Sequence, residues 1–230
     1  MKDDQTVTGI ILTAGNSTRF KKNRNKNFEV INGKPVIEYS IEVFENSEYI
    51  DDIIIAVREK DKDIVESILK NRKNKKHINL INGGQTRQES VYNSIKQTNS
   101  DIVIIHDGAR PILKDDYIDK CLIGINNADG VSIAVKSKDT IKITNSEGVV
   151  IETTKRDNTW NIQTPQCFIR EILLDAHEKY EKALNITDDC MLLEKAKKKV
   201  KLVEGNYTNI KITTQNDVAL AKIYLENNFI

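Results

Sequence analysis

The chain has 230 residues, of which 39% are hydrophobic and 30% charged, the balance of an ordinary globular protein. Its net charge of +1 leaves no overall basic field, so we expect neither a nucleic acid nor a membrane as a partner. The three cysteines are far apart in the sequence, and neither a leader peptide nor a membrane span is evident. These features predict a reduced, cytoplasmic protein.

Short apolar runs alternate with helical patterns along the chain. Strands are expected at residues 9–12, 53–57, 78–81, 102–105 and 131–135, most of them apolar enough to be buried on both faces of a parallel sheet. Helices are expected at residues 35–44, 61–70, 86–96, 115–123 and 187–197, and Gly124 is expected to end the fourth of them. This alternation predicts an α/β fold in which a mostly parallel, doubly wound sheet is flanked by helices.

Residues 139–154, D-T-I-K-I-T-N-S-E-G-V-V-I-E-T-T, interrupt this rhythm. Two alternating stretches flank an N-S-E-G turn, which is the signature of a β-hairpin, and no helix pattern separates them. The hairpin is therefore expected to project from the sheet as an arm. No linker composition is present, so we expect one domain, residues 1–230, with an arm at about 137–158.

The first strand ends in T-A-G-N-S-T-R, residues 13–19, at the sheet edge where open α/β folds bind ligands. Gly15 allows close approach of backbone to a ligand, successive N–H groups can bind an anion, and Arg19 is a permanent cation suited to phosphate. Lys26 is a second cation that can fold back over the same anion. The loop lacks the G-K-[ST] of a Walker loop and the three glycines of a dehydrogenase fingerprint, but a purely structural turn is an alternative.

Other polar residues follow other strands. Asp107, in H-D-G-A-R-P, lies at the same edge as the opening loop and can hold Mg²⁺ or cap the next turn. His106 is interpreted as a packed histidine rather than a general base.

A second motif, G-G-Q-T-R-Q-E-S at residues 83–90, leads from a strand into a helix. Its glycines free the backbone to approach a flat base, and Ser90 can bind a base or ribose; a plain turn is the alternative. Arg156, Thr187 and Lys211 come later in the chain, and together with a phosphate-binding loop they would make a second anion site; ordinary surface positions are the alternative.

Eight motifs occur in the order seen in the 2-C-methyl-D-erythritol 4-phosphate cytidylyltransferases. They are L-T-A-G-N-S-T-R-F, N-K-N-F, G-G-Q-T-R-Q-E-S-V, H-D-G-A-R-P, K-D-T-I-K, W-N-I-Q-T-P-Q, T-D-D and E-G-N-Y-T-N-I-K-I-T. The chain therefore resembles that family from about residue 9 to residue 225. The resemblance implies a Rossmann-like nucleotidyltransferase domain whose protruding β-arm interlocks a homodimer.

The resemblance also implies the reaction. The phosphate of 2-C-methyl-D-erythritol 4-phosphate attacks the α-phosphorus of CTP in the presence of Mg²⁺, and pyrophosphate leaves. The product is 4-diphosphocytidyl-2-C-methyl-D-erythritol, an intermediate of non-mevalonate isoprenoid precursor biosynthesis. Such transfers depend on positioning and charge neutralisation more than on covalent chemistry.

Roles for individual residues follow from the same resemblance. Catalytic roles fall to Arg19, Lys26, Arg156 and Lys211. Nucleotide binding falls to Thr13, Ala14, Gly15, Asn16, Ser17, Gly84, Ser90 and Asp107, with Asp107 also serving the metal. Acceptor-substrate binding falls to Arg110, Thr140, Arg156, Thr164, Thr187 and Lys211, some of them reaching the site from the partner subunit's arm.

The chain departs from the family pattern in two places. Thr13, Ser17 and Phe20 stand where the family often has the first Ala, second Gly and Met of A-A-G-x-G-x-R-M. Asn25 and Asn27 flank Lys26 where the family more often reads P-K-Q. The lysine is kept, so Lys26 retains its expected role.

Two rival functions stay open at this point. Ribitol 5-phosphate cytidylyltransferases share T-P-Q and N-x-K-I-T-T with this chain, although H-D-G-A-R-P and Arg156 with Trp160 favour the methylerythritol enzyme. A non-catalytic nucleotide-binding module is the second rival, but such a module has no need of Arg19, Lys26 and Asp107 together.

Overall fold

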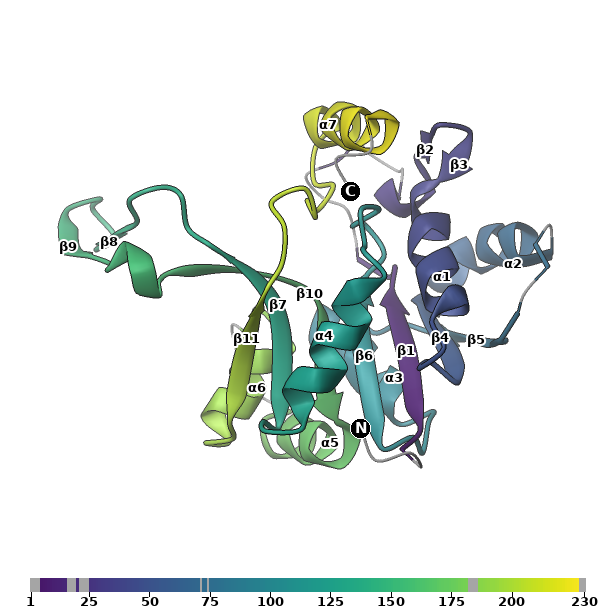
Figure 1. Ribbon diagram of the computed structural model, residues 1–230, viewed down its shortest axis with the longest axis horizontal. Coiled ribbons are helices and arrows are strands. Elements are labelled where there is room, and N and C mark those ends of the chain that lie inside the picture. Colours follow the sequence, from purple (N-terminus) through teal and green to yellow (C-terminus); the bar gives the residue numbers. More distant parts are fainter. Residues whose placement is uncertain are drawn as a thin grey trace.

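A seven-stranded sheet with helices on both faces forms the centre of the computed structural model, which describes residues 5–15, 20, 25–70, 72–73, 75–181 and 186–227 (Figure 1). In sheet order the strands are β11 (Val200–Glu204), β7 (Gly130–Lys136), β10 (Trp160–Ile169), β6 (Ile102–Asp107), β1 (Val7–Leu12), β4 (Asp52–Val57) and β5 (His77–Asn82). Neighbouring strands are parallel except at β10, which is antiparallel to β6 and β7. The five expected strands and the mostly parallel sheet are confirmed.

The register between β1 and β6 brings two expected site segments together. Every residue of both strands is buried, as their apolar sequences predict. Leu12, the last residue of β1, pairs with Asp107, the last residue of β6, and the N–H of Gly108 donates to the Leu12 carbonyl at 3.0 Å. The opening loop and the H-D-G-A-R-P turn therefore leave the sheet side by side.

Strand β10 was not expected, because its sequence W-N-I-Q-T-P-Q is polar and contains a proline. It pairs with β7 on both sides of a register shift between Ile162 and Gln166. Pro165, which has no N–H to give to a ladder, lies within that irregular stretch, where proline is tolerated in a sheet. Strand β10 thereby carries the chain from the arm back into the core.

The helices cover both faces of the sheet. Helices α1 (Val36–Asn46), α2 (Lys62–Lys70) and α4 (Asp116–Ile125) pack into one hydrophobic cluster, and α3 (Arg87–Ile95), α5 (Arg170–Lys179) and α6 (Asp189–Lys195) into the other. One expectation is wrong: Gly124 lies inside α4, which runs on to Ile125. A Cβ at Gly124 would press on Val131, so this glycine serves close helix–sheet packing rather than a helix stop.

A third apolar cluster lies beyond the carboxyl ends of the strands. Helix α7 (Gln215–Glu226) packs there beside the small hairpin of β2 (Val30–Ile31) and β3 (Lys34–Pro35) (Figure 1). Its buried contacts include Ile31, Ile112 and Ile212. The segment that leads into α7 is thus held over the edge where the opening loop lies.

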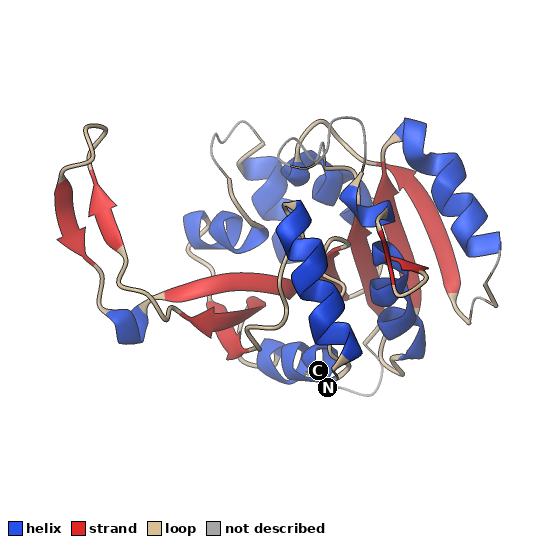
Figure 2. Cartoon of the chain, turned by 90° about the horizontal axis from the view of Figure 1, so that it is seen from above, coloured by secondary structure: helices blue, strands red, loops and turns tan. Residues whose placement is uncertain are grey.

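The expected hairpin is present as an arm. Strands β8 (Lys142–Thr144) and β9 (Val150–Thr153) pair antiparallel and, in both views, extend away from the body of the molecule (Figures 1 and 2). Gly148 takes a φ of 82° in the turn, a conformation that glycine adopts readily. All residues of both strands are exposed.

Two further observations bear on the protein's surroundings. In the described ranges no helix has the length and apolar character needed to cross a membrane. Cys121, Cys167 and Cys190 are all buried, free thiols.

Candidate active site

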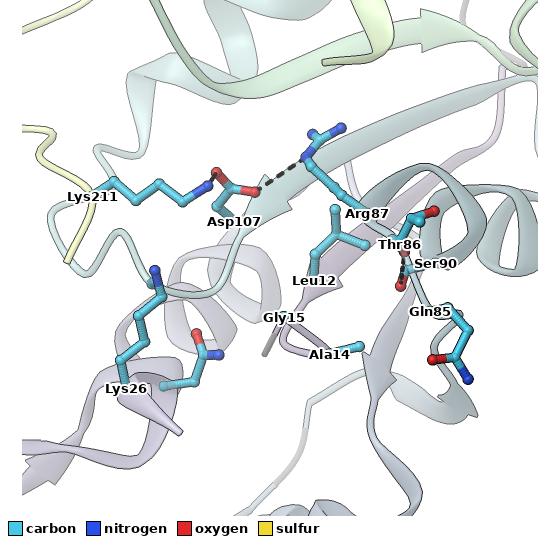
Figure 3. A pocket seen from close by; sticks show the side chains of 12 residues that line it. Leu12, Ala14, Gly15, Lys26, Gln85, Thr86, Arg87, Ser90, Asp107 and Lys211 are labelled. Carbon is cyan, nitrogen blue, oxygen red and sulfur yellow. Dashed lines mark hydrogen bonds and ion pairs between the residues drawn. The ribbon is translucent and has the colours of Figure 1, made fainter. Parts of the chain in front are cut away.

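A cavity of about 220 Å³ opens at the carboxyl ends of β1 and β6 (Figure 3). It is lined by Leu12, Ala14, Gly15, Lys26, Asn27, Gln85, Thr86, Arg87, Ser90, Asp107, Ala109 and Lys211. Six of these, Ala14, Gly15, Lys26, Ser90, Asp107 and Lys211, were expected at the site from the sequence, and they come from five separate segments of the chain. The fold therefore gathers distant motifs around one space, with cations and a carboxylate facing it.

Lys26 reaches the cavity from a short 3-10 helix, η1 (Lys26–Phe28). The amide of Asn25 donates to the carbonyl of Thr13 at 3.1 Å, and that of Asn27 donates to the same carbonyl at 3.2 Å. Asn25 also bonds Asp61 at 2.9 Å, so the turn is tied both to the opening loop and to the end of η2 (Glu59–Asp61). The two asparagines that depart from the family pattern thus fix the lysine-bearing turn against the loop.

The loop between β5 and α3 forms the opposite wall. Gly83 abuts Ala14 so closely that a Cβ at position 83 would overlap the Ala14 methyl group. Ser90 donates to the carbonyl of Thr86 at 2.8 Å and accepts from the N–H of Gly84 at 3.1 Å. Thr86 caps α3 by accepting from the N–H of Glu89. These hydrogen bonds hold the loop in one conformation, in which Gln85, Thr86 and Ser90 line the cavity.

Asp107 is the electrostatic centre of the site. Its carboxylate lies 2.7 Å from Lys211 Nζ and 3.5 Å from the Nε of Arg87 (Figure 3). The Nε of Arg110 lies 3.9 Å from the same carboxylate. Burial by itself would raise the pKa of Asp107, but the three surrounding cations outweigh burial and hold this pKa well below its usual range. The carboxylate is therefore ionised, and the cations around it leave a surplus of positive charge for a polyanion.

A buried network supports Asp107 from behind. The hydroxyl of Thr164 accepts from the Asp107 N–H at 3.1 Å and lies 3.0 Å from His106 Nδ1. Arg110 donates to the carbonyl of Asn209 at 2.6 Å, which joins the turn after β6 to the segment that carries Lys211. His106 is fully buried, with Nε2 at 3.1 Å from the Arg110 carbonyl, as a packed histidine should be.

Burial, the largest cause, lowers the pKa of His106 from 6.5 to about 4. The unfolded chain then binds more protons than the folded chain between these two values, so stability is present above pH 6.5 and is lost as the pH falls towards 4. We expect this group to remove up to about 3 kcal/mol of unfolding free energy over that window. Urea unfolding in metal-free buffer measures the unfolding free energy as a function of pH. Its decrease between pH 6.5 and pH 4 should be present in the wild type and in His77→Gln, which alters an exposed histidine as a control, and should be lost in His106→Gln. The same decrease in His106→Gln as in the wild type would contradict the role of His106.

Other expected site residues lie outside the cavity lining. Thr13 donates its hydroxyl to the carbonyl of Ala56 at 2.8 Å, so its side chain points towards β4. Thr140 and Arg156 are exposed on the arm, where they hydrogen-bond each other at 2.9 Å. Thr187 is exposed just before α6. The expectations for Asn16, Ser17 and Arg19 lie outside the described residues.

Sequence reasoning missed several residues that line the cavity, above all Arg87. This arginine lies inside the G-G-Q-T-R-Q-E-S motif, at residues 83–90. Its partner Asp189 lies 102 positions further along the chain, and no local pattern connects the two. Gln85 and Thr86 also line the cavity from this motif, in which only the glycines and Ser90 have side-chain or backbone properties that suggest a base site.

Asp107 is also the one carboxylate that lines the cavity among the described residues. No group of three or more His, Cys, Asp or Glu side chains placed to hold a metal exists within that part of the chain. Mg²⁺ commonly takes one or two carboxylates and completes its shell with water and substrate phosphates. One ionised carboxylate at the mouth of a cationic cavity fits that mode of binding.

Comparisons with known proteins agree with this geometry. The model of the 2-C-methyl-D-erythritol 4-phosphate cytidylyltransferase family matches residues 7–227. Enzymes of that name from Caldanaerobacter subterraneus and Clostridium acetobutylicum are each 40% identical to this chain, over 95% and 96% of it and 98% of their own lengths. The crystal structure of 4-diphosphocytidyl-2C-methyl-D-erythritol synthase from Anaerococcus prevotii superposes with a TM-score of 0.86 at 34% identity, covering 96% of this chain and 99% of that one. The order of motifs, the fold and these relatives lead to one conclusion: the chain belongs to the 2-C-methyl-D-erythritol 4-phosphate cytidylyltransferase family.

Proposed function

We propose that the cavity around Asp107 is where this cytidylyltransferase transfers the cytidylyl group of CTP to 2-C-methyl-D-erythritol 4-phosphate and releases pyrophosphate. The observation that carries this assignment is the pairing of Asp107 with Lys211 at 2.7 Å inside a cavity that Lys26 and Ser90 also line. Cytosine and ribose lie against the loop that holds Gly84 and Ser90, and the triphosphate lies along Ala14 and Gly15.

Lys26 and Lys211 both line the cavity and come from distant segments of the chain (Figure 3). Lys26, with Arg19, neutralises the charge that develops on the α-phosphoryl oxygens and the leaving pyrophosphate. Lys211 and Arg110 hold the attacking phosphate of the acceptor near Asp107. Several cations around one cavity fit a phosphoryl-type transfer, which depends on positioning and charge neutralisation.

Mg²⁺ is the proposed cofactor, held by Asp107 and the nucleotide phosphates. Bound there, Mg²⁺ would supply positive charge that offsets the negative charge of the nucleotide phosphates. The chain itself supplies an ionised carboxylate whose orientation is fixed by neighbouring cations. We also propose that the protein works as a single domain in the cytoplasm, where its three free thiols remain reduced.

A homodimer is the proposed working form, with the arm of each protomer completing the partner's site. Ile143, Val150 and Ile151 are 45%, 53% and 68% exposed on the arm. A two-stranded hairpin is marginally stable in water by itself, and a grouped apolar surface is typical of a protein interface. Thr140 and Arg156 are carried on this same arm and add a cation and a hydroxyl to acceptor binding.

Pyrophosphate release tests the proposed function directly. With CTP and Mg²⁺, we expect release with 2-C-methyl-D-erythritol 4-phosphate and only background release with ribitol 5-phosphate or without an acceptor. Preference for ribitol 5-phosphate would overturn the acceptor assignment. Chelation of divalent cations with EDTA should abolish release, and excess Mg²⁺ should restore it. CTP binding without release under any of these conditions would leave a nucleotide-binding module in place of an enzyme.

A further inference from the structure

Arg87 occupies a position between two carboxylates that come from distant parts of the chain. It is the first residue of α3, directly after the capping residue Thr86. Its Nη1 lies 2.5 Å from Oδ2 of Asp189, the first residue of α6, and its Nε lies 3.5 Å from Oδ1 of Asp107. One guanidinium therefore links the base side of the cavity, the end of β6 and the T-D-D segment.

Asp189 holds Arg87 from behind. The Asp189 side chain is 1% exposed, and His177 Nε2 lies 3.4 Å from its other oxygen. Burial would raise the pKa of Asp189, but the charge of Arg87 and then the contact with His177 outweigh it and lower this pKa. A carboxylate so deeply buried is costly without its cation, so Arg87 is held firmly at this end.

The other end of the guanidinium faces the reaction site. Arg87 meets Oδ1 of Asp107 while Lys211 meets Oδ2, so two cations fix the plane of the carboxylate from different sides (Figure 3). The Arg87 side chain is 26% exposed and lines the cavity, whereas its anchor Asp189 does not. The rigid fork of arginine suits this task, because its nitrogen atoms can serve two partners at once.

We propose that Arg87, anchored by Asp189, is a positioning residue for cytidylyl transfer. It orients the Asp107 carboxylate towards the nucleotide and couples the loop that contacts the base to the T-D-D segment that carries Thr187. This inference rests on the proposed role of Asp107 in the site. It assigns a function to an ion pair whose second member lies outside the cavity.

A pair of substitutions separates positioning from folding. In Arg87→Met, Asp189 is left buried without its cation, so we expect the unfolding midpoint to fall. The Asp107 carboxylate also loses one of the cations that orient it, so we expect kcat to fall by on the order of 10²-fold. In the double variant Arg87→Met with Asp189→Leu, no unpaired buried carboxylate remains at position 189, so the midpoint should return towards the wild-type value. The kcat should stay low, because the Asp107 carboxylate still lacks the orienting contact with Arg87.

Calorimetric titration with Mg·CTP, without an acceptor, supplies the second readout. We expect about one CTP bound per chain in both variants, with a Kd within about threefold of the wild type, because the loss lies in orientation rather than in uniform binding. A purely structural role would instead reduce the number of binding sites in proportion to kcat. Recovery of kcat together with stability in the double variant would overturn the proposal.

Two further variants complete the design. Arg72→Met removes another largely buried arginine, one that pairs with Glu38, Glu42 and Glu45 away from the cavity, and should cost stability with no loss of kcat per bound CTP. Arg87→Lys keeps the charge but not the fork, so its kcat should lie between those of the wild type and Arg87→Met. If the wild type turns over CTP and 2-C-methyl-D-erythritol 4-phosphate and Arg87→Met does so equally well, only the role of Arg87 fails. If the wild type itself is inactive, it is the proposed function that fails.

Discussion

Lys26→Ala is expected to lower kcat by on the order of 10²–10³-fold while the Kd for CTP stays within about tenfold of the wild type. The Lys26 side chain lines the same cavity as Asp107 and Lys211 (Figure 3). A cation placed where charge develops on departing pyrophosphate stabilises the transition state more than the bound nucleotide, so its loss falls on kcat. Single-turnover pyrophosphate release and calorimetric CTP binding measure the two quantities separately.

Lys34→Ala is the matched control for this prediction. Lys34 is also a lysine near a short structural element, but its ammonium group pairs with Glu42 at 2.6 Å and does not line the cavity. Its kcat should equal that of the wild type. Parallel losses of kcat and CTP affinity in Lys26→Ala would mean that Lys26 supplies uniform binding alone, and the transition-state role would have to be given up.

The second large effect concerns the arm. Arg156→Ala is expected to raise the KM for 2-C-methyl-D-erythritol 4-phosphate by about 10- to 100-fold, the range for loss of a charge-assisted hydrogen bond, and to leave the KM for CTP nearly unchanged. The opposite pattern would place Arg156 at the nucleotide and overturn the assignment of the arm to the acceptor.

Mixing two defective chains tests whether the arm acts across a dimer. The Arg156→Ala chain has a defective arm and an intact cavity, and the Lys26→Ala chain has an intact arm and a defective cavity. In a mixed dimer, the intact cavity of the first chain therefore meets the intact arm of the second. After subunit exchange at equal amounts, half of the cavities are sound and half of those face a sound arm, so about a quarter of wild-type activity should return at low acceptor concentration. No recovery after proven exchange would mean that each arm serves its own chain.

The strands of the fold could be predicted where an apolar run of sequence forms a buried strand. Strands β1 and β6 are buried throughout and contain the apolar runs at residues 9–12 and 102–105, and their register determines which loops meet. Strand β10 could not be predicted in the same way. Its polar residues are satisfied by partners across the sheet, for example Gln166 donating to Ser132 at 3.2 Å, and these partners are known only from the tertiary structure.

In the candidate site, too, some residues could be predicted from local sequence and others depend on tertiary contacts. Ala14, Ser90 and Asp107 follow strand ends, and a sheet brings strand ends together, so their meeting was predictable. The roles of Asn25 and Asn27 were not, because both depend on a hydrogen bond to the Thr13 carbonyl across the loop. The position of Arg87 could not be predicted, because its partner Asp189 comes from α6, a distant part of the chain.

The contact between Gly83 and Ala14 has a consequence for the spacing of the proposed subsites. Because Gly83 has no side chain, the loop before α3 and the loop after β1 touch directly. In the proposed binding mode the base lies against the first loop and the phosphates lie along the second. A Cβ at position 83 would overlap the Ala14 methyl group and force the two loops apart, so the absence of one carbon atom keeps the two subsites close together.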